Sequence, residues 1–510
     1  MSDTTYQIIA LIIYMAAMLF IGWYAYRKTV NLTDYMLGGR GLGAAVGALS
    51  AGAADMSGWL LMGLPGAIYV SGLVEVWIAI GLTIGAYLNW FFVAPRLRMY
   101  SFVTSDSITI PSFLENRLKD NSRLLRIVSG IIILIFFTFY VSSGMVAGGV
   151  FFESSFGLDY HLGLVIVSAV VVAYTLFGGF LAVSYTDFVQ GLMMFLALIL
   201  VPLIGVFVTG GFSETADSIR AVDSTLLNFT TGASFIGILS AVAWGLGYFG
   251  QPHIIVRFMA IKTLKEVRQA RRIGISWMIL SLLGATATAL VGIAYFQQNP
   301  NLKLGDPEGV FIVLGQIFFH PLIAGFMLAA VLAAIMSTIS SQLIVTSSAL
   351  IEDLYKIAFK KVSTDKQYVS LGRLAVLVIA LIAAFLAWEQ NETILDLVAY
   401  AWAGFGAAFG PLILLSLFWR KLTTWGALAG MVVGAATVII WDAIGTASDE
   451  KGATALTNFI GSVYEIIPGF ILCLLGAIII SLITYRKNAE IEREFSETER
   501  LIKEKEVPVK

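Results

Sequence analysis

Cysteine, histidine and charged residues are all scarce in this chain of 510 residues. The single cysteine, Cys473, excludes a disulfide within the chain, and the three histidines lie too far apart for the spacing of a metal site. Charged residues make up 13% of the chain, about half of their usual share in soluble proteins. The formal net charge of −1 gives no indication of nucleic-acid binding. No P-loop motif of the form Gly-x4-Gly-Lys-Ser/Thr is present.

Long apolar runs dominate the chain instead. Hydrophobic residues make up 58% of it and the mean hydropathy is +0.86, which is typical of an all-helical membrane protein. Hydropathy predicts about thirteen transmembrane helices. They lie near residues 5–26, 44–70, 73–94, 124–152, 161–184, 188–211, 233–251, 273–297, 322–350, 370–388, 394–418, 423–444 and 463–485. Tight turns are expected near residues 71 and 186, and a short surface helix within 298–321.

Basic residues test this topology, because short loops on the inner side of a membrane are enriched in lysine and arginine. If the spans alternate, only Arg220, Lys303 and Lys451 of the 32 basic residues lie on the outer side. The N-terminus is therefore predicted outside and the C-terminus inside. Residues 1–485 then form a single transmembrane domain, and residues 486–510 form a charged cytoplasmic tail, expected to be a solvated helix. No segment remains that could hold a soluble catalytic core, so an enzyme is not expected.

The second span contains an aspartate, Asp55, near its middle. A carboxylate at this depth costs roughly 2.5–3.5 kcal/mol on insertion scales, so it must face protein, water or a cation. Gly52, Gly58 and neighbouring small residues predict that the helix is interrupted here. Carbonyl groups that leave a helix at membrane depth must line a cavity, and with a carboxylate they suit a small, hard cation. The alternative is a structural aspartate bonded to a neighbouring helix.

The seventh span is interrupted as well, since residues 244–252 contain three glycines and end at Pro252. Trp244 and Tyr248 are four residues apart and are expected on one helix face, either as a ligand-binding pair or as core packing. Spans two and seven each begin a run of five helices and start on opposite sides of the membrane. This is typical of secondary transporters built from inverted repeats. The repeats are expected to be helices 2–6 and 7–11, within residues 44–211 and 233–418.

Span nine provides hydroxyl groups near its middle. Ala334 lies three and four residues before Ser337 and Thr338, so the three residues share one face. Their oxygens, with the carbonyls of Ala53 and Met56, would give about five neutral ligands, a suitable shell for sodium. Serine and threonine in membrane helices also bond their own backbone or join helices, so the spacing alone leaves both interpretations open.

At these residues the sequence resembles the sodium/solute symporter family, and within it the bacterial sodium/proline symporters. The resemblance rests on Gly52 to Gly63, Trp244 to Pro252, Ala333 to Ser340, Tyr400 to Pro411, Leu37 to Arg40, and Gly178 to Ser184 ahead of Asp187. It extends from about residue 5 to residue 485. It implies a leucine-transporter-like core and sodium-coupled uptake of L-proline through the bacterial cell membrane. It implies no cofactor besides Na+ as the coupling ion, and no obligatory protein partner.

The same resemblance assigns site residues. In the family, the sodium site uses the positions matched by Ala53, Met56, Ala334, Ser337 and Thr338. Asp55 and Asp187 match carboxylates implicated in sodium-dependent function. The positions matched by Tyr140, Trp244, Tyr248 and Pro252 are implicated in proline binding, and Ser57 and Gly58 match residues close to both ligands. Some relatives have serine at the position of Ala54, a difference expected to alter affinity but not the reaction.

Other interpretations of the sequence stay open. The main alternative is the same fold and sodium coupling with another solute, such as another amino acid, pantothenate or a monocarboxylate. Lithium can be expected to replace sodium, whereas proton coupling is less favoured by a shell of neutral oxygens. A passive channel would be expected to have rings of like charge or repeated filter sequences, and the chain has neither.

Overall fold

The computed structural model describes residues 2–29, 31–358, 364–389, 393–446 and 454–504. Within these residues every regular element is a helix, apart from an isolated bridge between Leu42 and Ile261. The prediction of an all-helical fold is confirmed. Lys451, one of the basic residues expected on the outer side, lies outside the described residues.

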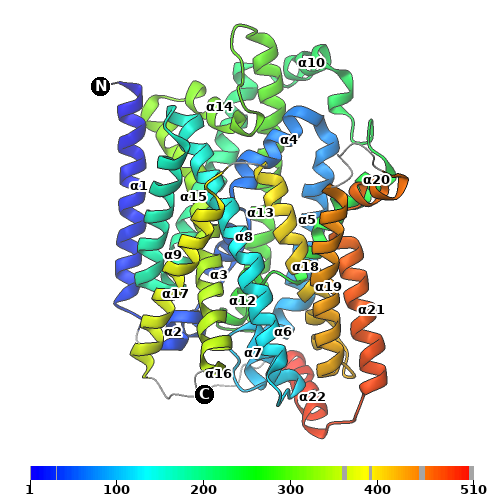
Figure 1. The fold of residues 1–510 in the computed structure, drawn as a ribbon. Helices are drawn as coiled ribbons and strands as arrows, with labels where there is room; N and C mark the ends of the chain where they lie inside the picture. The colour runs from blue at the N-terminus through cyan, green and yellow to red at the C-terminus, as the bar shows by residue number, and fades with distance from the viewer. Residues whose placement is uncertain (1, 30, 359–363, 390–392, 447–453, 505–510) are drawn as a thin grey trace.

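The helices follow one another along the chain as Figure 1 shows. They are α1 (Asp3–Tyr26), α2 (Leu32–Leu37), η1 (Gly38–Arg40), α3 (Ala44–Asp55), η2 (Trp59–Gly63), α4 (Leu64–Ser71), η3 (Gly72–Glu75), α5 (Val76–Leu88), η4 (Asn89–Val93), α6 (Ala94–Val103), α7 (Ile110–Leu118), α8 (Leu124–Phe156), α9 (Tyr160–Val208), α10 (Phe212–Val222), η5 (Ser224–Leu227), α11 (Phe235–Ala243), η6 (Trp244–Phe249), α12 (Pro252–Ala260), α13 (Leu264–Gln298), η7 (Pro307–Gly309), α14 (Val310–Phe318), α15 (Pro321–Ser348), η8 (Ala349–Tyr355), α16 (Lys356–Ala358), α17 (Asp365–Leu386), α18 (Ile394–Phe418), α19 (Thr424–Thr446), α20 (Ala455–Ser462), α21 (Ile466–Thr484) and α22 (Ala489–Glu504).

Ten helices in the described part of the chain are long and apolar enough to cross a membrane. Three further apolar helices are shorter, at Tyr160–Leu176, Phe235–Phe249 and Pro307–Phe318. The first two correspond to segments expected as full spans, and the third contains the short helix expected between spans eight and nine. The chain is therefore a multi-pass membrane protein.

One of the two predicted tight turns is wrong. The turn near residue 71 is confirmed, because Gly72 adopts a positive φ of 79° between α4 and α5. Near residue 186 the chain is instead helical, and the break in α9 lies at Gly179, with φ 60° and ψ −155°. A Cβ atom at Gly179 would lie 2.6 Å from the ring of Tyr35, so glycine satisfies both the backbone conformation and the close packing.

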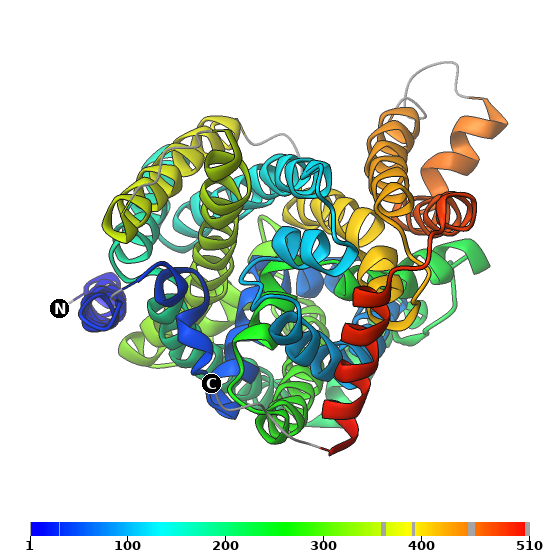
Figure 2. The same ribbon diagram turned by 90° about the horizontal axis from the view of Figure 1, so that it is seen from below.

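The core of the bundle is built around α15. Every residue from Met327 to Ile344 is buried, and α15 packs against α1, α8 and α9. α19 and α21 pack against each other at the edge of the bundle (Figures 1 and 2). α1 begins at the upper end in Figure 1, whereas α22 lies at the lower end.

The tail forms the expected helix, α22, but it is not solvated on all sides. It crosses the lower end of the bundle, as Figure 2 shows from below. Phe495 is only 3% exposed and packs edge-on against Tyr100 of α6 at 5.9 Å between ring centroids. Lys119 pairs with Glu494 at 2.6 Å. Arg420, in the connection between α18 and α19, pairs with two further glutamates of α22, Glu492 at 3.0 Å and Glu499 at 2.9 Å.

Candidate functional site

The second span is interrupted where the sequence predicts it. α3 ends at Asp55, and Met56 leaves the helix with φ −79° and ψ 74°. The Ser57 amide then donates to the carbonyl of Asp55 at 2.9 Å, a local bond that replaces the helical one. The next turns are the π-helix η2, so the helix resumes with a different register. The break leaves backbone oxygens around residues 53–56 without their usual helical hydrogen bonds, in the middle of the span.

The seventh span is also interrupted, over η6 and the two residues that follow it. η6 is a 3-10 helix, and Gln251 is extended with φ −78° and ψ 105°. Pro252 occupies the first turn of α12, where proline is tolerated, so the chain is helical again after the break. Because a 3-10 helix has three residues per turn, Trp244 and Tyr248 do not lie one above the other. The Trp244 ring stacks on Tyr464, with 5.3 Å between centroids.

Two side chains from other helices bond the carbonyl groups of η6. Asn89, fully buried in the π-helix η4, donates to the carbonyl of Tyr248 at 2.9 Å. Trp402 of α18 donates from Nε1 to the carbonyl of Trp244 at 2.8 Å. A Cβ atom at Gly247 would lie only 1.9 Å from that same indole nitrogen, so the glycine allows this approach. Sequence reasoning assigned no role to Asn89, although a polar residue in an otherwise apolar span was a signal.

Four of the five predicted sodium ligands converge between α3 and α15. The Ser337 hydroxyl donates to the carbonyls of Ala53 at 2.7 Å and Ala334 at 3.0 Å. The Thr338 hydroxyl lies 3.5 Å and 3.3 Å from the same two oxygens. All four residues are buried. Met56, the fifth, is buried at the break itself. The arrangement is a group of neutral oxygens on two helices, one of them broken.

Asp55 faces the aromatic residues of η6. The Tyr248 hydroxyl donates a hydrogen bond to Asp55 Oδ2, although the two residues are far apart in sequence. The Tyr248 ring meets Trp402 edge-on, with 5.1 Å between centroids. Tyr140 of α8 is buried, and its ring meets His253 of α12 edge-on with 5.8 Å between centroids. The predicted residues Asp55 and Tyr248 thus lie together.

Asp187 lies in a separate polar group. Its Oδ2 accepts hydrogen bonds from Ser50 at 2.7 Å and from the Arg257 guanidinium at 3.1 Å. Ser341, one turn beyond Ser337 on α15, lies 3.4 Å from the same oxygen. Asp187 and Arg257 are both fully buried, so this pair holds α9 against α12 with its charge internally balanced. Arg257 also donates to the carbonyl of His253, so the Asp187 group lies next to the break in the seventh span.

The remaining predicted residues are placed around the two breaks. Ser57 is 3% exposed, and a Cβ atom at Gly58 would lie 3.1 Å from Ala147 and 3.3 Å from Ile335. Pro252 lines a small cavity that Thr109 and Asp353 also line.

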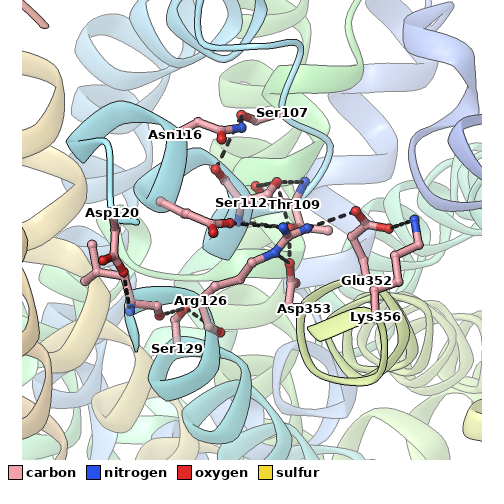
Figure 3. Close-up of polar contacts among 12 residues, drawn as sticks. Ser107, Thr109, Ser112, Asn116, Asp120, Arg126, Ser129, Glu352, Asp353 and Lys356 are labelled. Carbon is pink, nitrogen blue, oxygen red and sulfur yellow. Dashed lines mark hydrogen bonds and ion pairs between the residues drawn. The ribbon is translucent and has the colours of Figure 1, made fainter. Parts of the chain in front are cut away.

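That cavity borders a second buried polar cluster, centred on Arg126 of α8 (Figure 3). The Arg126 guanidinium pairs with Asp353 at 2.8 Å, Glu352 at 2.9 Å and Glu115 at 3.0 Å. Thr109 also donates to Asp353, at 2.9 Å. The cluster ties together α7, α8 and the π-helix η8, at the end of the bundle where α22 lies.

Comparisons with known proteins place this architecture in a family. The model of the sodium:solute symporter family matches residues 35–434. The chain is 61% identical over 480 residues to the high-affinity proline transporter PutP of Bacillus subtilis (strain 168), covering 94% of this chain and 98% of the relative. It is 58% identical to the osmoregulated proline transporter OpuE of the same organism, covering 98% and 99%. A sodium/proline symporter of Staphylococcus aureus (strain JH9) is 52% identical, covering 98% and 97%.

Solved structures agree on the fold. A Na+-coupled sialic acid symporter in a substrate-bound outward-open state superimposes with a TM-score of 0.79 at 20% identity, covering 95% of this chain and 99% of that chain. Mhp1, a nucleobase-cation-symport-1 family transporter in a closed conformation, superimposes with a TM-score of 0.54 at 14% identity, covering 92% and 99%. The extent of the family match, with relatives more than half identical over almost the whole chain, leads to one conclusion: this membrane protein belongs to the sodium:solute symporter family.

Proposed function

We propose that the protein is a secondary transporter that couples the entry of Na+ to the uptake of L-proline by alternating access. The observation that supports this best is the meeting of two interrupted helices at a group of buried oxygens and aromatic rings. Interrupted helices at midplane are where secondary transporters bind their ions and substrates. Proline is the solute named for relatives that are 52–61% identical.

The sodium site would use the carbonyls of Ala53, Met56 and Ala334 and the hydroxyls of Ser337 and Thr338. Hard oxygen ligands suit a small alkali cation, and the hydroxyl and carbonyl oxygens already lie within 3.5 Å of one another. For Asp55 and Asp187 we retain the predicted role in sodium-dependent transport, as carboxylates close to these five ligands. Sodium bound here would fix the break in span two against α15.

The substrate site would lie beside it, among Ser57, Gly58, Tyr140, Trp244, Tyr248 and Pro252. Aromatic faces can cover a pyrrolidine ring and attract a secondary ammonium group. The free amides of a broken helix can hold a carboxylate. Because sodium and substrate would stabilise one arrangement of the same break, each would raise the affinity for the other.

We propose thirteen spans, with the N-terminus outside and the C-terminus inside the bacterial cell membrane. Residues 1–485 would form one transport domain, and 486–510 a cytoplasmic tail. The second to sixth transmembrane spans and the seventh to eleventh would form two inverted repeats, in a leucine-transporter-like core. The N-terminal end of α1 and the helix α22 lie at opposite ends of the bundle, which supports placing the two termini on opposite sides of the membrane.

The energy of one sodium ion suffices for this reaction. Entry of one charge across 100 mV releases about 2.3 kcal/mol. A tenfold sodium gradient adds about 1.4 kcal/mol. Together these sustain a solute gradient of several hundredfold.

The test is uptake of radiolabelled L-proline by proteoliposomes at fixed pH, with and without an inward sodium gradient. Accumulation should require sodium and should increase with an inside-negative potential. Accumulation driven equally well by a proton gradient alone would contradict sodium coupling. Absence of proline uptake under every gradient would contradict the substrate, and other amino acids, pantothenate and monocarboxylates would then be assayed in the same vesicles.

A further inference from the structure

Two buried carboxylates lie near the interrupted helices, and they differ in how their charge is balanced. Asp187 is fully buried and pairs with Arg257. Asp55 is only 2% exposed, and its contact with Tyr248 is a hydrogen bond from a neutral hydroxyl. Its other oxygen, Oδ1, has no hydrogen-bond partner among the described residues. An ionised carboxylate that is buried without a positive partner is strongly unfavourable, so the cationic group of a ligand would stabilise the ionised form of Asp55.

Two positive groups take part in the proposed reaction, Na+ and the ammonium group of the amino acid. The direction of the Asp55 side chain indicates which of them it binds. The oxygens proposed for sodium bond to one another, and these bonds link Ala53 with Ser337 and Thr338. The Asp55 carboxylate bonds instead to Tyr248, on the other interrupted helix. The backbone of this stretch therefore faces the sodium ligands, whereas the side chain two residues later faces the aromatic residues.

We propose that the Asp55 carboxylate binds the ammonium group of the transported amino acid, with Oδ1 as the acceptor that the substrate satisfies. This inference rests on the function proposed above. The Tyr248 hydroxyl occupies Oδ2 and holds the carboxylate in place, so one oxygen stays available for an N–H donor. The Tyr248 ring, which meets Trp402 edge-on, would provide aromatic surface for a cationic amine.

This role also explains how sodium and substrate would be coupled. Ala53 and Asp55 are separated by one residue at the end of α3. A cation held by the Ala53 carbonyl would fix the end of that helix, and with it the carboxylate that receives the ammonium group. Asp55 would then influence the sodium dependence of uptake without being a sodium ligand.

The experiment compares two ligands that differ only in the charged group. L-proline and tetrahydrofuran-2-carboxylate have the same ring and carboxylate, but the second has an ether oxygen in place of the ammonium. Ligand-induced thermal stabilisation of the purified protein at saturating sodium gives the affinity for each. The wild-type protein should prefer proline by at least about tenfold, the value of a hydrogen bond to a charged group. Asp55→Asn should lose most of this preference.

The matched control is Asp353→Asn, which removes an equally buried carboxylate that has its own counter-ion, Arg126. It should keep the preference for proline. If Asp55→Asn does not fold, Tyr248→Phe replaces it, because loss of the hydroxyl should weaken proline binding more than binding of the ether analogue. Equal weakening of the two ligands in Tyr248→Phe would overturn the proposal.

Sodium is measured separately, as stabilisation by NaCl relative to choline chloride without any amino acid. Asp55→Asn should respond to sodium within about twofold of the wild type, whereas Thr338→Ala should respond less. Loss of the sodium response in Asp55→Asn would make Asp55 a sodium ligand and overturn the proposal. An unchanged preference for proline in Asp55→Asn would overturn it while leaving sodium-coupled proline transport intact. A wild-type protein that proline never stabilises would instead refute the proposed substrate and, with it, this inference.

Discussion

Replacement of Arg126 by methionine is expected to destabilise the protein, because it leaves the buried carboxylate of Asp353 without a counter-ion. Methionine retains most of the aliphatic length of arginine but removes the guanidinium that pairs with Asp353, Glu352 and Glu115. Glu352 would keep its ion pair with Lys356. Glu115 has a side chain that is 12% exposed and can recruit water. The Asp353 side chain is 0% exposed and, among the described residues, would keep only the hydrogen bond from Thr109.

The size of the effect follows from this difference between the three carboxylates. Breaking a buried ion pair by removal of one partner costs about 3–5 kcal/mol, because the other charge stays buried. The Arg126 side chain is 17% exposed, so we expect a value of about 3 kcal/mol, near the lower limit. Adding Asp353→Asn to Arg126→Met should recover a large part of the lost stability. The expected coupling energy between the two substitutions is about 0.5–3 kcal/mol.

The assay is unfolding in mixed micelles by increasing sodium dodecyl sulfate, followed by tryptophan fluorescence. It compares the wild type, Arg126→Met, Asp353→Asn and the double variant. Arg500→Met serves as the control for loss of a surface arginine, since its side chain is 54% exposed, and its midpoint should stay at the wild-type value. A wild-type midpoint in Arg126→Met would refute the reasoning. So would a double variant no more stable than Arg126→Met, because the cost would then not arise from Asp353.

Three further outcomes are expected. Thr338→Ala should raise the sodium concentration for half-maximal uptake by about tenfold, since one of about five ligands is lost. Thr286→Ala is the control, because its hydroxyl bonds the carbonyl of Leu282 in its own helix, and it should leave this concentration unchanged. Equal sodium dependence in both variants would contradict the cation site. Trp244→Ala and Tyr248→Ala should each raise the KM for proline at saturating sodium, and an unchanged KM in both would mean that these rings only pack. Burial, with a smaller contribution from Asp306, raises the pKa of Glu308 to about 7 from its ordinary 4.5, so the native state binds this proton more tightly and stability should decline as pH rises from about 4.5 to about 7. Glu308→Gln should remove that part of the pH dependence of the thermal midpoint, and an unaltered profile would assign it to another group.

The interruptions of spans two and seven could be predicted from the sequence because their causes are local. Small residues around Asp55 and the glycines before Pro252 disfavour a continuous helix wherever they occur. The prediction that Ala334, Ser337 and Thr338 share one helix face likewise follows from their spacing in the sequence. These predictions did not depend on knowing which helices are neighbours.

Contacts between distant segments could not be predicted in the same way. Nothing in the local sequence pairs Asp187 with Arg257, or directs Asn89 and Trp402 to the carbonyls of η6. The turn placed between two hydropathy spans near residue 186 was wrong, because Thr186 is buried inside a continuous stretch of helix and the break lies at Gly179. Polar side chains in a membrane helix indicate that a partner exists, but the fold determines which one.

The position of α22 has a consequence for how this protein can be observed. The helix pairs through Glu494 with Lys119 and through Glu492 with Arg420, residues from opposite halves of the sequence. A fluorophore on its exposed face would therefore move with whichever half retains it when the halves shift relative to each other. Energy transfer from such a label to a second one on α7, and in separate samples on α19, would record a transport cycle from one end of the molecule. A bulky fusion partner joined directly to α22 would, by the same contacts, disturb the motion it was meant to report.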